Sequence, residues 1–249
     1  GEISGTGSLT KAGAGAVTLT AINSFSGGTT ITSGTLIGNT QNFGTGNIVN
    51  NASLVFDQST AGSFGGGISG TGSLTKTGSG ALTLTGVSSF SGGTTISSGS
   101  LIASSQSLGT GPIVNNTSLV LNQSSAGTLV GAISGTGSLA KTGASAVTLT
   151  GVNSFSGGTT ISAGSLIGNT QSFGTGNIVN NASLVLDQAT DASFAKLISG
   201  TGSLTKAGAG AVTLTAINSF SGGTTISAGS LIGNTQSLGT GNIVNNASL

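Results

Sequence analysis

The chain of 249 residues contains no histidine, cysteine, tryptophan, tyrosine, methionine or arginine, and it has a single proline. These absences remove the side chains that most often serve as catalytic bases, thiol nucleophiles, soft metal ligands and forked phosphate binders. We therefore expect no catalytic residue, no metal site and no cofactor, and we expect that the protein is not an enzyme. Without cysteine there are also no disulfides, which excludes a small disulfide-stapled scaffold but does not choose a compartment.

Charged side chains are almost as scarce. Their formal net charge of +1 comes from Lys11, Lys76, Lys141, Lys196 and Lys206 against Glu2, Asp57, Asp187 and Asp191. So few cations cannot form the basic patch that nucleic acid requires. No run of 18 apolar residues is long enough for a membrane span, and the first residues lack the basic and apolar regions of a signal peptide. We expect any export signal to have been removed or to lie outside this segment.

Glycine and aliphatic residues take the place of the missing types, with 47 glycines and 35% hydrophobic residues. Disordered chains are poor in aliphatics and usually rich in charge, so this composition predicts an ordered chain. Self-similarity is the dominant feature: Ile3, Ile68, Ile133 and Ile198 each begin a copy of one pattern, and their constant spacing defines a 65-residue repeat. The sequence FSGGTTI recurs unchanged from Phe25, Phe90, Phe155 and Phe220.

The expected domain organisation is one continuous segment, 1–249, with repeats 3–67, 68–132, 133–197 and 198–249. The last copy stops at Leu249, the counterpart of Leu54, within an apolar run. Terminal repeats of solenoids normally carry a polar cap, and neither end of the chain has one. We therefore expect this segment to be a window of a longer array.

Short β-strands are predicted within each copy because apolar and Thr or Ser residues alternate between glycines, as in Ala16-Val17-Thr18-Leu19-Thr20. No helical spacing occurs, and each glycine would cost a helix about 1 kcal/mol. Apolar anchors at Leu9, Ile31, Leu54 and Leu74 recur at intervals of about 20 residues or slightly more, which indicates about three coils per 65-residue repeat. The predicted fold is all-β, a right-handed parallel β-helix (β-solenoid). A β-propeller is disfavoured because its usual Trp and Tyr landmarks are absent.

Several polar positions recur with the repeat. Lys11, Lys76, Lys141 and Lys206 are expected to lie in solvent, where they aid solubility and discourage sideways sheet pairing; binding of an anion is the alternative. The Asn pairs that begin at Asn50, Asn115, Asn180 and Asn245 are expected either to cap a bend or to stack between coils, and we favour the bend. Pro112 should lie in a turn or at a strand start, because proline cannot donate to a β-ladder.

Some motifs resemble chemical sites, but a structural interpretation is favoured for each. Gly5-Thr6-Gly7 and Gly13-Ala14-Gly15 lack the helix that a phosphate-binding loop needs and are expected to be turns. Phe64-Gly65-Gly66-Gly67 lacks the Asp of calcium-binding repeats. Asp187 and Asp191 occur together in one copy only, so a solvated face is favoured over a hydrolase pair. Asn-x-Ser at Asn51, Asn116, Asn181 and Asn246 is a potential glycan acceptor, but its Ser enters an apolar strand.

The pattern Gly5-x-Gly7-x-Leu9-x-Lys11-x-Gly13-x-Gly15-x-Val17-x-Leu19, continued by Asn23-x-Phe25-x-Gly27-Gly28-Thr29-Thr30-Ile31 and Gly34-x-Leu36, resembles the passenger-associated repeat of bacterial autotransporters, also called the autotransporter-associated β-strand repeat. It covers about half of each copy. It departs from the family where Phe25 stands in place of the usual Tyr, and where Ala21 and Ala216 stand in place of Gly. The resemblance implies a right-handed β-helical passenger stalk on the surface of a Gram-negative bacterium, with no catalytic residues to carry over.

The function expected from these features is a non-enzymatic stalk of a surface adhesin or autotransporter passenger, or an extracellular filament, serving adhesion or biofilm formation. The expected partner is the chain itself, stacked end to end through exposed strand edges, together with a host or abiotic surface. The alternative is a surface-binding solenoid that recognises glycan or ice through Thr and Asn rows such as Thr18-Leu19-Thr20 and Thr30-Ile31-Thr32. A polysaccharide-cleaving β-helix is disfavoured because it needs a cleft with clustered acidic or basic residues.

Overall fold

A computed structural model describes residues 1–247, and within that range the protein consists of β-strands and turns without any helix. The residues form two compact units. The first contains residues 1–120 and 130–136, and the second contains residues 121–129 and the described residues from 137 onward. Leu249, the expected counterpart of Leu54, lies outside the described residues, as does Ser248.

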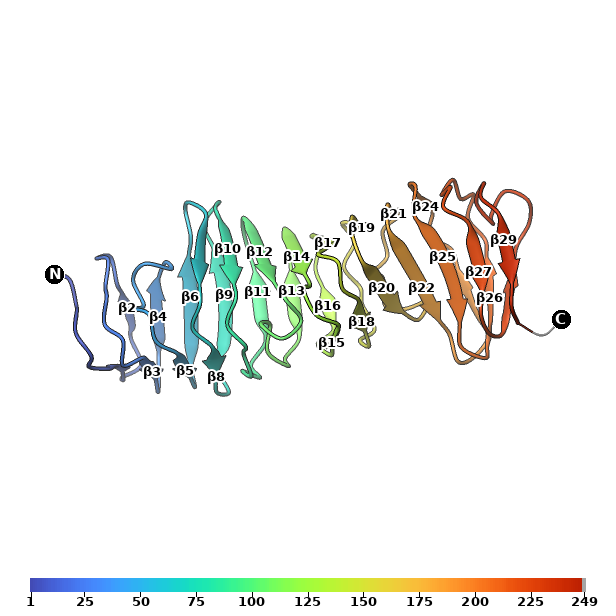
Figure 1. The fold of residues 1–249 in the computed structure, drawn as a ribbon. Coiled ribbons are helices and arrows are strands. Elements are labelled where there is room, and N and C mark those ends of the chain that lie inside the picture. The colour runs from blue at the N-terminus through green and yellow to red at the C-terminus, as the bar shows by residue number, and fades with distance from the viewer. Residues whose placement is uncertain (248–249) are drawn as a thin grey trace. The chain divides into compact units, whose positions relative to one another are not determined.

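The strands of the first unit lie on three sides of the coils, and Figure 1 shows β2, β4, β6 and β9 of this unit side by side in chain order. The first side contains β1 (Leu9–Lys11), β3 (Thr29–Ile31), β5 (Ile48–Asn50) and β8 (Ile68–Ser69). The second side contains β2 (Ala16–Thr18), β4 (Thr35–Gly38), β6 (Ser53–Asp57), β9 (Ser73–Thr77), β11 (Thr94–Ile96), β13 (Ile113–Asn115) and β16 (Ile133–Ser134). The third side contains β7 (Gly62–Phe64), β10 (Ala81–Leu84) and β12 (Ser100–Ala103).

The second unit repeats this arrangement, and the residues of β14 (Ser118–Asn122) are divided between the two units. One side contains β17 (Ser138–Thr142), β19 (Thr159–Ile161), β21 (Ile178–Asn180) and β24 (Ile198–Ser199). The next contains β15 (Gly127–Leu129), β18 (Val147–Leu149), β20 (Ser165–Gly168), β22 (Ser183–Asp187), β25 (Ser203–Ala207), β27 (Thr224–Ile226) and β29 (Ile243–Asn245). The remaining side contains β23 (Ala192–Phe194), β26 (Ala211–Leu214) and β28 (Ser230–Ile232).

Parallel pairing defines the length of one coil. Leu9 lies opposite Thr29, Thr29 opposite Ile48 and Ile48 opposite Ile68, so one coil contains about 20 residues. On the second side Thr35 lies opposite Ser53, which is a slightly shorter step along the chain. Strands that recur once per coil and pair in parallel with their successors define a β-solenoid. The predicted fold class, with about three coils per repeat, is confirmed.

The predicted order of apolar anchors is wrong in detail. Ile31 lies opposite Lys11 and Asn50, so the anchors Leu9, Ile31 and Leu54 do not follow one ladder. Three coils from Leu9 end at Ile68, before the counterpart of Leu9 in the next copy is reached, and the residues between them carry the chain to the next side. As a result β9, the counterpart of β1, lies in the sheet of β2, β4 and β6. In the second unit β17 and β25 are likewise in different sheets. Equivalent strands of successive repeats therefore lie on successive sides of the solenoid.

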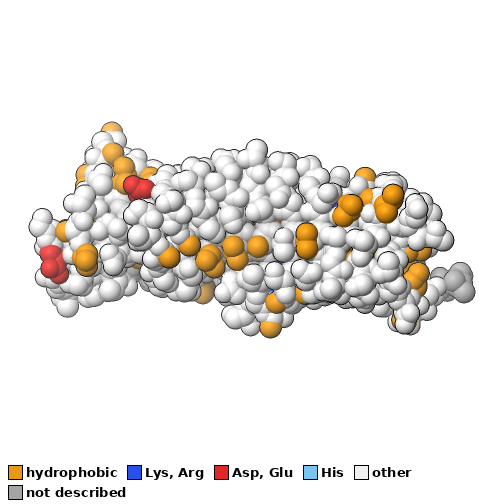
Figure 2. Space-filling model, turned by 90° about the horizontal axis from the view of Figure 1, so that it is seen from above, with side chains coloured by type: hydrophobic (Ala, Val, Ile, Leu, Met, Phe, Trp, Pro, Cys, Tyr) orange, Lys and Arg blue, Asp and Glu red, His pale blue; other side chains and the backbone are white. Residues whose placement is uncertain are grey.

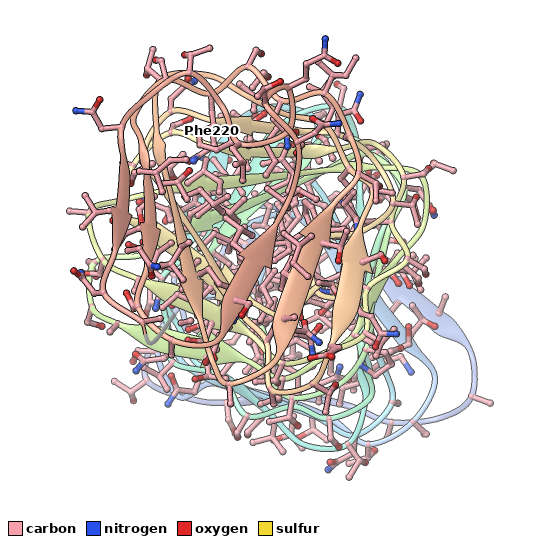
Figure 3. The ribbon with its side chains drawn as sticks, turned by 90° about the vertical axis from the view of Figure 1, so that its right-hand side faces the viewer. Phe220 is labelled. Atoms are coloured by element: carbon pink, nitrogen blue, oxygen red, sulfur yellow. The ribbon has the colours of Figure 1, made fainter. Side chains whose placement is uncertain are left out.

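The core is built from the inward-facing residues of these strands and from buried phenylalanines between them. In β4 and β6 the side chains alternate between half-exposed and buried, which is the period of two expected for strands with one face inside. The phenylalanines of FSGGTTI are all buried in the described structure, including Phe220, which is labelled in Figure 3. Phe56 packs edge-on against Phe43, with ring centroids 5.0 Å apart, and lies 5.5 Å from Phe64. Aromatic stacking thus extends from coil to coil.

Glycines and Pro112 occupy the places where the chain turns. Gly70 has φ 103°, and a Cβ atom there would lie 2.2 Å from the carbonyl oxygen of Asn50 in the preceding coil. Gly5, its counterpart, also has positive φ, so the Gly-Thr-Gly motif is a turn, as expected. Pro112 directly precedes β13, and its carbonyl accepts a hydrogen bond from Thr94 N at 2.9 Å. The predicted placement of this proline at a strand start is confirmed.

Candidate functional site

The recurring lysines point into the solenoid. Lys76, Lys141 and Lys206 are fully buried, and Lys11 is 5% exposed. Lys76 Nζ donates to the carbonyl oxygens of Thr77 at 2.6 Å, Gly78 at 2.8 Å and Ser98 at 3.2 Å. The first two acceptors belong to the turn that follows β9, and the third lies 22 residues further along, in the next coil. We call this arrangement the lysine clamp.

The same lysine clamp recurs in every copy. Each ammonium group binds two carbonyls of its own turn and one of the turn 22 residues further along; these acceptors are Ala12, Gly13 and Ser33 for Lys11, Thr142, Gly143 and Ala163 for Lys141, and Ala207, Gly208 and Ala228 for Lys206. An ammonium group has three donors, and three carbonyls satisfy them all. The prediction that these lysines lie in solvent is wrong: the long flexible side chain reaches the carbonyls of two turns at once, and it does so even where a carbonyl already accepts from a backbone N–H, as Thr77 O does from Gln58 N at 2.9 Å.

Burial lowers the pKa of Lys76, Lys141 and Lys206, because desolvation disfavours the charged form. The carboxylate of Asp57 raises the pKa of Lys76 in opposition, and Asp187 does the same for Lys206. Lys196 differs from the clamp lysines: it is half-exposed, its Nζ lies 4.7 Å from the centre of the Phe194 ring, and it donates to Thr170 O at 3.0 Å. Burial lowers its pKa as well.

Chemical labelling can test the lysine clamp directly. We expect an amine-reactive ester at pH 8 to modify the N-terminus and Lys196 within minutes and to leave Lys76, Lys141 and Lys206 unmodified, as read by peptide mass spectrometry. A lowered pKa alone would make these three amines more reactive, so their protection reports burial rather than protonation. Labelling in denaturant, where all five lysines should react, is the control. Labelling of Lys141 at the rate of Lys196 in the folded protein would contradict the clamp.

The first asparagine of each pair is structural. Asn50 is fully buried; its Nδ2 donates to Ser73 O at 2.8 Å in the next coil, and its Oδ1 accepts from Ala52 N at 3.2 Å. Asn180 makes the same two bonds, to Ser203 O and from Ala182 N. The favoured alternative, capping of the bend, is confirmed. Asn50 does not stack in line with polar residues, because it lies opposite Ile31, and its bond to the next coil is to a backbone carbonyl. The second asparagine, Asn51, is exposed, and its Oδ1 accepts from Thr71 N at 3.3 Å.

Asn23, which sequence reasoning did not single out as a site, connects three coils. Its Oδ1 accepts from Ile3 N at 2.8 Å and its Nδ2 donates to Asn42 O at 2.6 Å. Asn218 repeats the pattern with Ile198 N and Ser237 O. In the second copy Ser88 replaces the asparagine and its hydroxyl still accepts from Ile68 N, at 3.1 Å. The signal available in the sequence was an asparagine that recurs two residues before the phenylalanine of FSGGTTI, as Asn23 does before Phe25 and Asn218 before Phe220. A polar residue that recurs among residues of the core needs hydrogen-bond partners there.

The acidic residues form no reactive cluster. Asp191 is exposed, and its Oδ1 accepts from Ala211 N at 2.8 Å; Asp187 is also exposed. Within residues 1–247 no group of three or more acidic, His or Cys side chains is placed to hold a metal ion. The described residues also include no helix long and apolar enough to cross a membrane.

The outer surface carries shallow recesses and sheet faces of low charge. One recess is lined by Ser26–Thr30 with Gly46, Asn47 and Val49, and equivalent recesses occur around Gly158 and Gly223. The predicted rows of Thr are mixed with aliphatic residues: Thr18 lies opposite Ile37, and Ile37 opposite Val55. Ser53, the hydroxyl residue of the first Asn-x-Ser, lies in β6 as expected.

These features define a class of protein: a parallel β-solenoid built from tandem repeats, whose recurring polar side chains join one coil to the next. The family model described as the passenger-associated-transport-repeat matches residues 9–37, 74–103, 139–167 and 204–232. The chain therefore carries four repeats of the passenger-associated-transport-repeat family, which confirms the resemblance found in its sequence. No curated protein and no solved structure matches the chain.

Proposed function

We propose that the chain is a non-enzymatic stalk region of a bacterial autotransporter passenger or adhesin, displayed outside the cell, which supplies rigid length for adhesion or biofilm formation. One observation carries the proposal: the recurring polar side chains of the interior, Lys76, Asn50 and Asn23 among them, are used to join coils. When the recurring polar groups of a solenoid form hydrogen bonds between its coils, the chain is suited to bear load along its axis rather than to transform a substrate. The family of the repeats supports the extracellular setting.

The repeat period and the strand edges at the end of an array suggest how such a stalk could be extended. The 65-residue period runs through the chain without insertion or deletion, so an array of such repeats can be extended copy by copy. Strand edges at the end of such an array have unpaired backbone groups, which can pair with a second copy. End-to-end stacking of copies would then extend the stalk into a filament.

The stalk function predicts that length grows linearly with repeat number. A coil of about 20 residues advances about 4.8 Å, so one 65-residue repeat adds about 16 Å. We expect that inserting two whole repeats lengthens the particle by about 32 Å in cryo-electron micrographs. A Gly/Ser linker of the same length, inserted at the same place, is the control and should add no ordered length. A particle that folds back or stays the same length after the repeat insertion would contradict the stalk.

Recognition of a glycan or of ice by the outer faces is the second candidate. The observation in its favour is the recurring recess beside Gly27 and Gly28, whose rim carries the hydroxyl of Thr30 and the amide of Asn47. The mixture of Ile and Val with Thr on the same faces speaks against a purely polar row. Thermal hysteresis of freezing tests the ice version, and retention on insoluble polysaccharide tests the glycan version.

A further inference from the structure

Lys196 differs from the other lysines in how loosely its side chain is held. In the part of the chain that the structure describes, it is the only lysine outside the lysine clamp. It is half-exposed, and its neighbours Ala195 and Leu197 are exposed. Its Nζ contacts Thr170 O at 3.0 Å and the ring of Phe194. The side chain therefore has one hydrogen bond and one ring contact to give up, both at the surface, where such contacts are weak.

The backbone around Lys196 must stand further from the coil beneath it than the equivalent backbone of the first two copies. There the counterparts of Lys196 are Gly66 and Gly131. A Cβ atom on Gly66 would collide with the carbonyl oxygen of Gly46 in the preceding coil, and one on Gly131 would collide with that of Gly111. A lysine fits this position only where the segment is lifted clear of that carbonyl.

The peptide bond that joins Lys196 to Leu197 is also poorly tied to its surroundings. In the first copy the equivalent N–H group, that of Gly67, donates to Asn47 Oδ1 at 2.8 Å. Leu197 N has no hydrogen bond to any described residue, and neither has the backbone of Lys196. The chain rejoins the ladder at Leu197 O, which accepts from Ile178 N at 2.9 Å. A short exposed segment with so few backbone hydrogen bonds opens at little cost.

The clamp lysines lie in paired strands instead. Lys206 is opposite Leu186 of β22 on one side and opposite Ile226 of β27 on the other. Lys76 is held in the same way between β6 and β11. An endopeptidase must draw several residues of its substrate into its own cleft, so two ladders and the three hydrogen bonds of a clamp would have to open before it could cut at either lysine.

We propose that the peptide bond between Lys196 and Leu197 is a cleavage site for a serine endopeptidase of lysine specificity, which cuts the folded array there and leaves its other lysines intact. The ammonium group of Lys196 suits the carboxylate-lined specificity pocket of such an enzyme. The serine takes the acyl group of Lys196 while Leu197 N leaves as an amine, and water then releases the Lys196 carboxylate. The chain has no arginine, and Figure 2 shows a face on which basic side chains are sparse.

The cut leaves the two pieces held together. Three ladders cross it: β21 pairs with β24, β22 with β25, and β23 with β26. Asn180 Nδ2 also donates across it, to Ser203 O at 2.8 Å. Residues 1–196 and 197–249 should therefore stay associated after hydrolysis and come apart only when the coils unfold. This inference depends on the fold and goes beyond the stalk function, which can hold or fail independently.

Limited digestion of the folded chain with trypsin tests the site, with the cuts assigned by mass spectrometry. We expect cleavage after Lys196 to be at least about 100-fold faster than cleavage after Lys76, Lys141 or Lys206, because only the latter three need ladders to open. The chain unfolded in urea, where all of these bonds should be cut, is the control. A folded chain that resists trypsin at Lys196 as long as at Lys76 overturns the proposal, and so does equally fast cleavage at both.

A moved lysine separates backbone freedom from mere exposure. In the double variant Lys196→Gln, Thr205→Lys the new lysine lies on the half-exposed side of β25, between β22 and β27. This variant should resist trypsin at position 205, whereas Lys196→Arg should be cut like the parent chain; circular dichroism checks that both are folded. Rapid cleavage at position 205 would overturn the role given to the free segment.

Size-exclusion chromatography of the digested chain tests the cohesion of the pieces. We expect the cut chain to elute with the uncut chain in native buffer and to separate into residues 1–196 and 197–249 in denaturant. Separation of the pieces in native buffer would overturn the claim that the ladders hold them. The stalk function is tested separately, by the insertion of repeats, so its failure would not be mistaken for failure at this site.

Discussion

Replacing Lys76 with methionine is expected to lower the free energy of unfolding by about 2 kcal/mol. Methionine keeps most of the buried aliphatic volume but offers no donor, so the carbonyls of Thr77, Gly78 and Ser98 lose their shared partner. Thr77 O keeps its hydrogen bond from Gln58 N at 2.9 Å, and Gly78 O keeps the one from Ser98 Oγ at 3.2 Å. The loss is therefore that of the hydrogen bonds from one charged donor, about 1.5 to 3 kcal/mol, rather than the cost of three unpaired carbonyls. Urea denaturation followed by circular dichroism measures the change.

Lys196→Met is the matched control, because that lysine is half-exposed and its Nζ has one carbonyl partner, Thr170 O. Its effect should stay below about 1 kcal/mol. Lys141→Met should behave like Lys76→Met, since its three acceptors are equivalent. Equal effects of Lys76→Met and Lys196→Met would show that the clamp contributes nothing specific to stability.

Truncating Phe56 to alanine is expected to cost about 3 to 5 kcal/mol, the range for a large aromatic side chain removed from a packed core. Phe56 is fully buried and its ring contacts those of Phe43 and Phe64. Alanine would leave a cavity between neighbouring coils and remove both ring contacts. The same urea denaturation measures the loss.

The chain itself provides the control for this substitution. Leucine occupies the counterparts of Phe56 in the other copies, at Leu121 and Leu186, and both are fully buried. Phe56→Leu should therefore cost less than about 1.5 kcal/mol. If leucine and alanine at position 56 were equally destabilising, filled apolar volume would not be what this position contributes to stability.

The sequence was sufficient to predict the fold class because its signals are local. Alternation such as Ala16-Val17-Thr18 indicates a strand, and glycines such as Gly70 mark turns, whatever surrounds them. The placement of Pro112 followed from its missing N–H alone. Tandem repetition then required the strands to stack, since no single copy can bury its own apolar face.

The path of the ladder could not be predicted in the same way. Leu9, Ile31 and Leu54 all belong to the apolar pattern, and alternation does not say which residue of one strand lies opposite which residue of the next. The pairing depends on the lengths of the turns, and those make a coil shorter than the interval from Leu9 to Ile31. A 65-residue repeat is therefore not a whole number of coils, and the equivalent strand of the next repeat lies on the next side of the solenoid.

The lysine clamp was missed for an energetic reason. A charged side chain is normally placed in solvent because burying it without partners is costly. The three carbonyls that compensate Lys76 come from two turns that are far apart in the sequence, and only the stacking of coils brings them together. Recurrence of a lone lysine at the end of an apolar strand was the available signal, and it is equally consistent with an exposed row.

Stability as a function of repeat number tests the central claim, that cohesion between coils holds the protein together. Proteins of one, two, three and four whole repeats should be compared by circular dichroism and urea denaturation under one set of conditions. We expect the single repeat to be unfolded and the denaturation midpoint to rise with each added repeat, since each new copy adds contacts between coils. A single repeat that folds with the midpoint of the four-repeat protein would contradict the account.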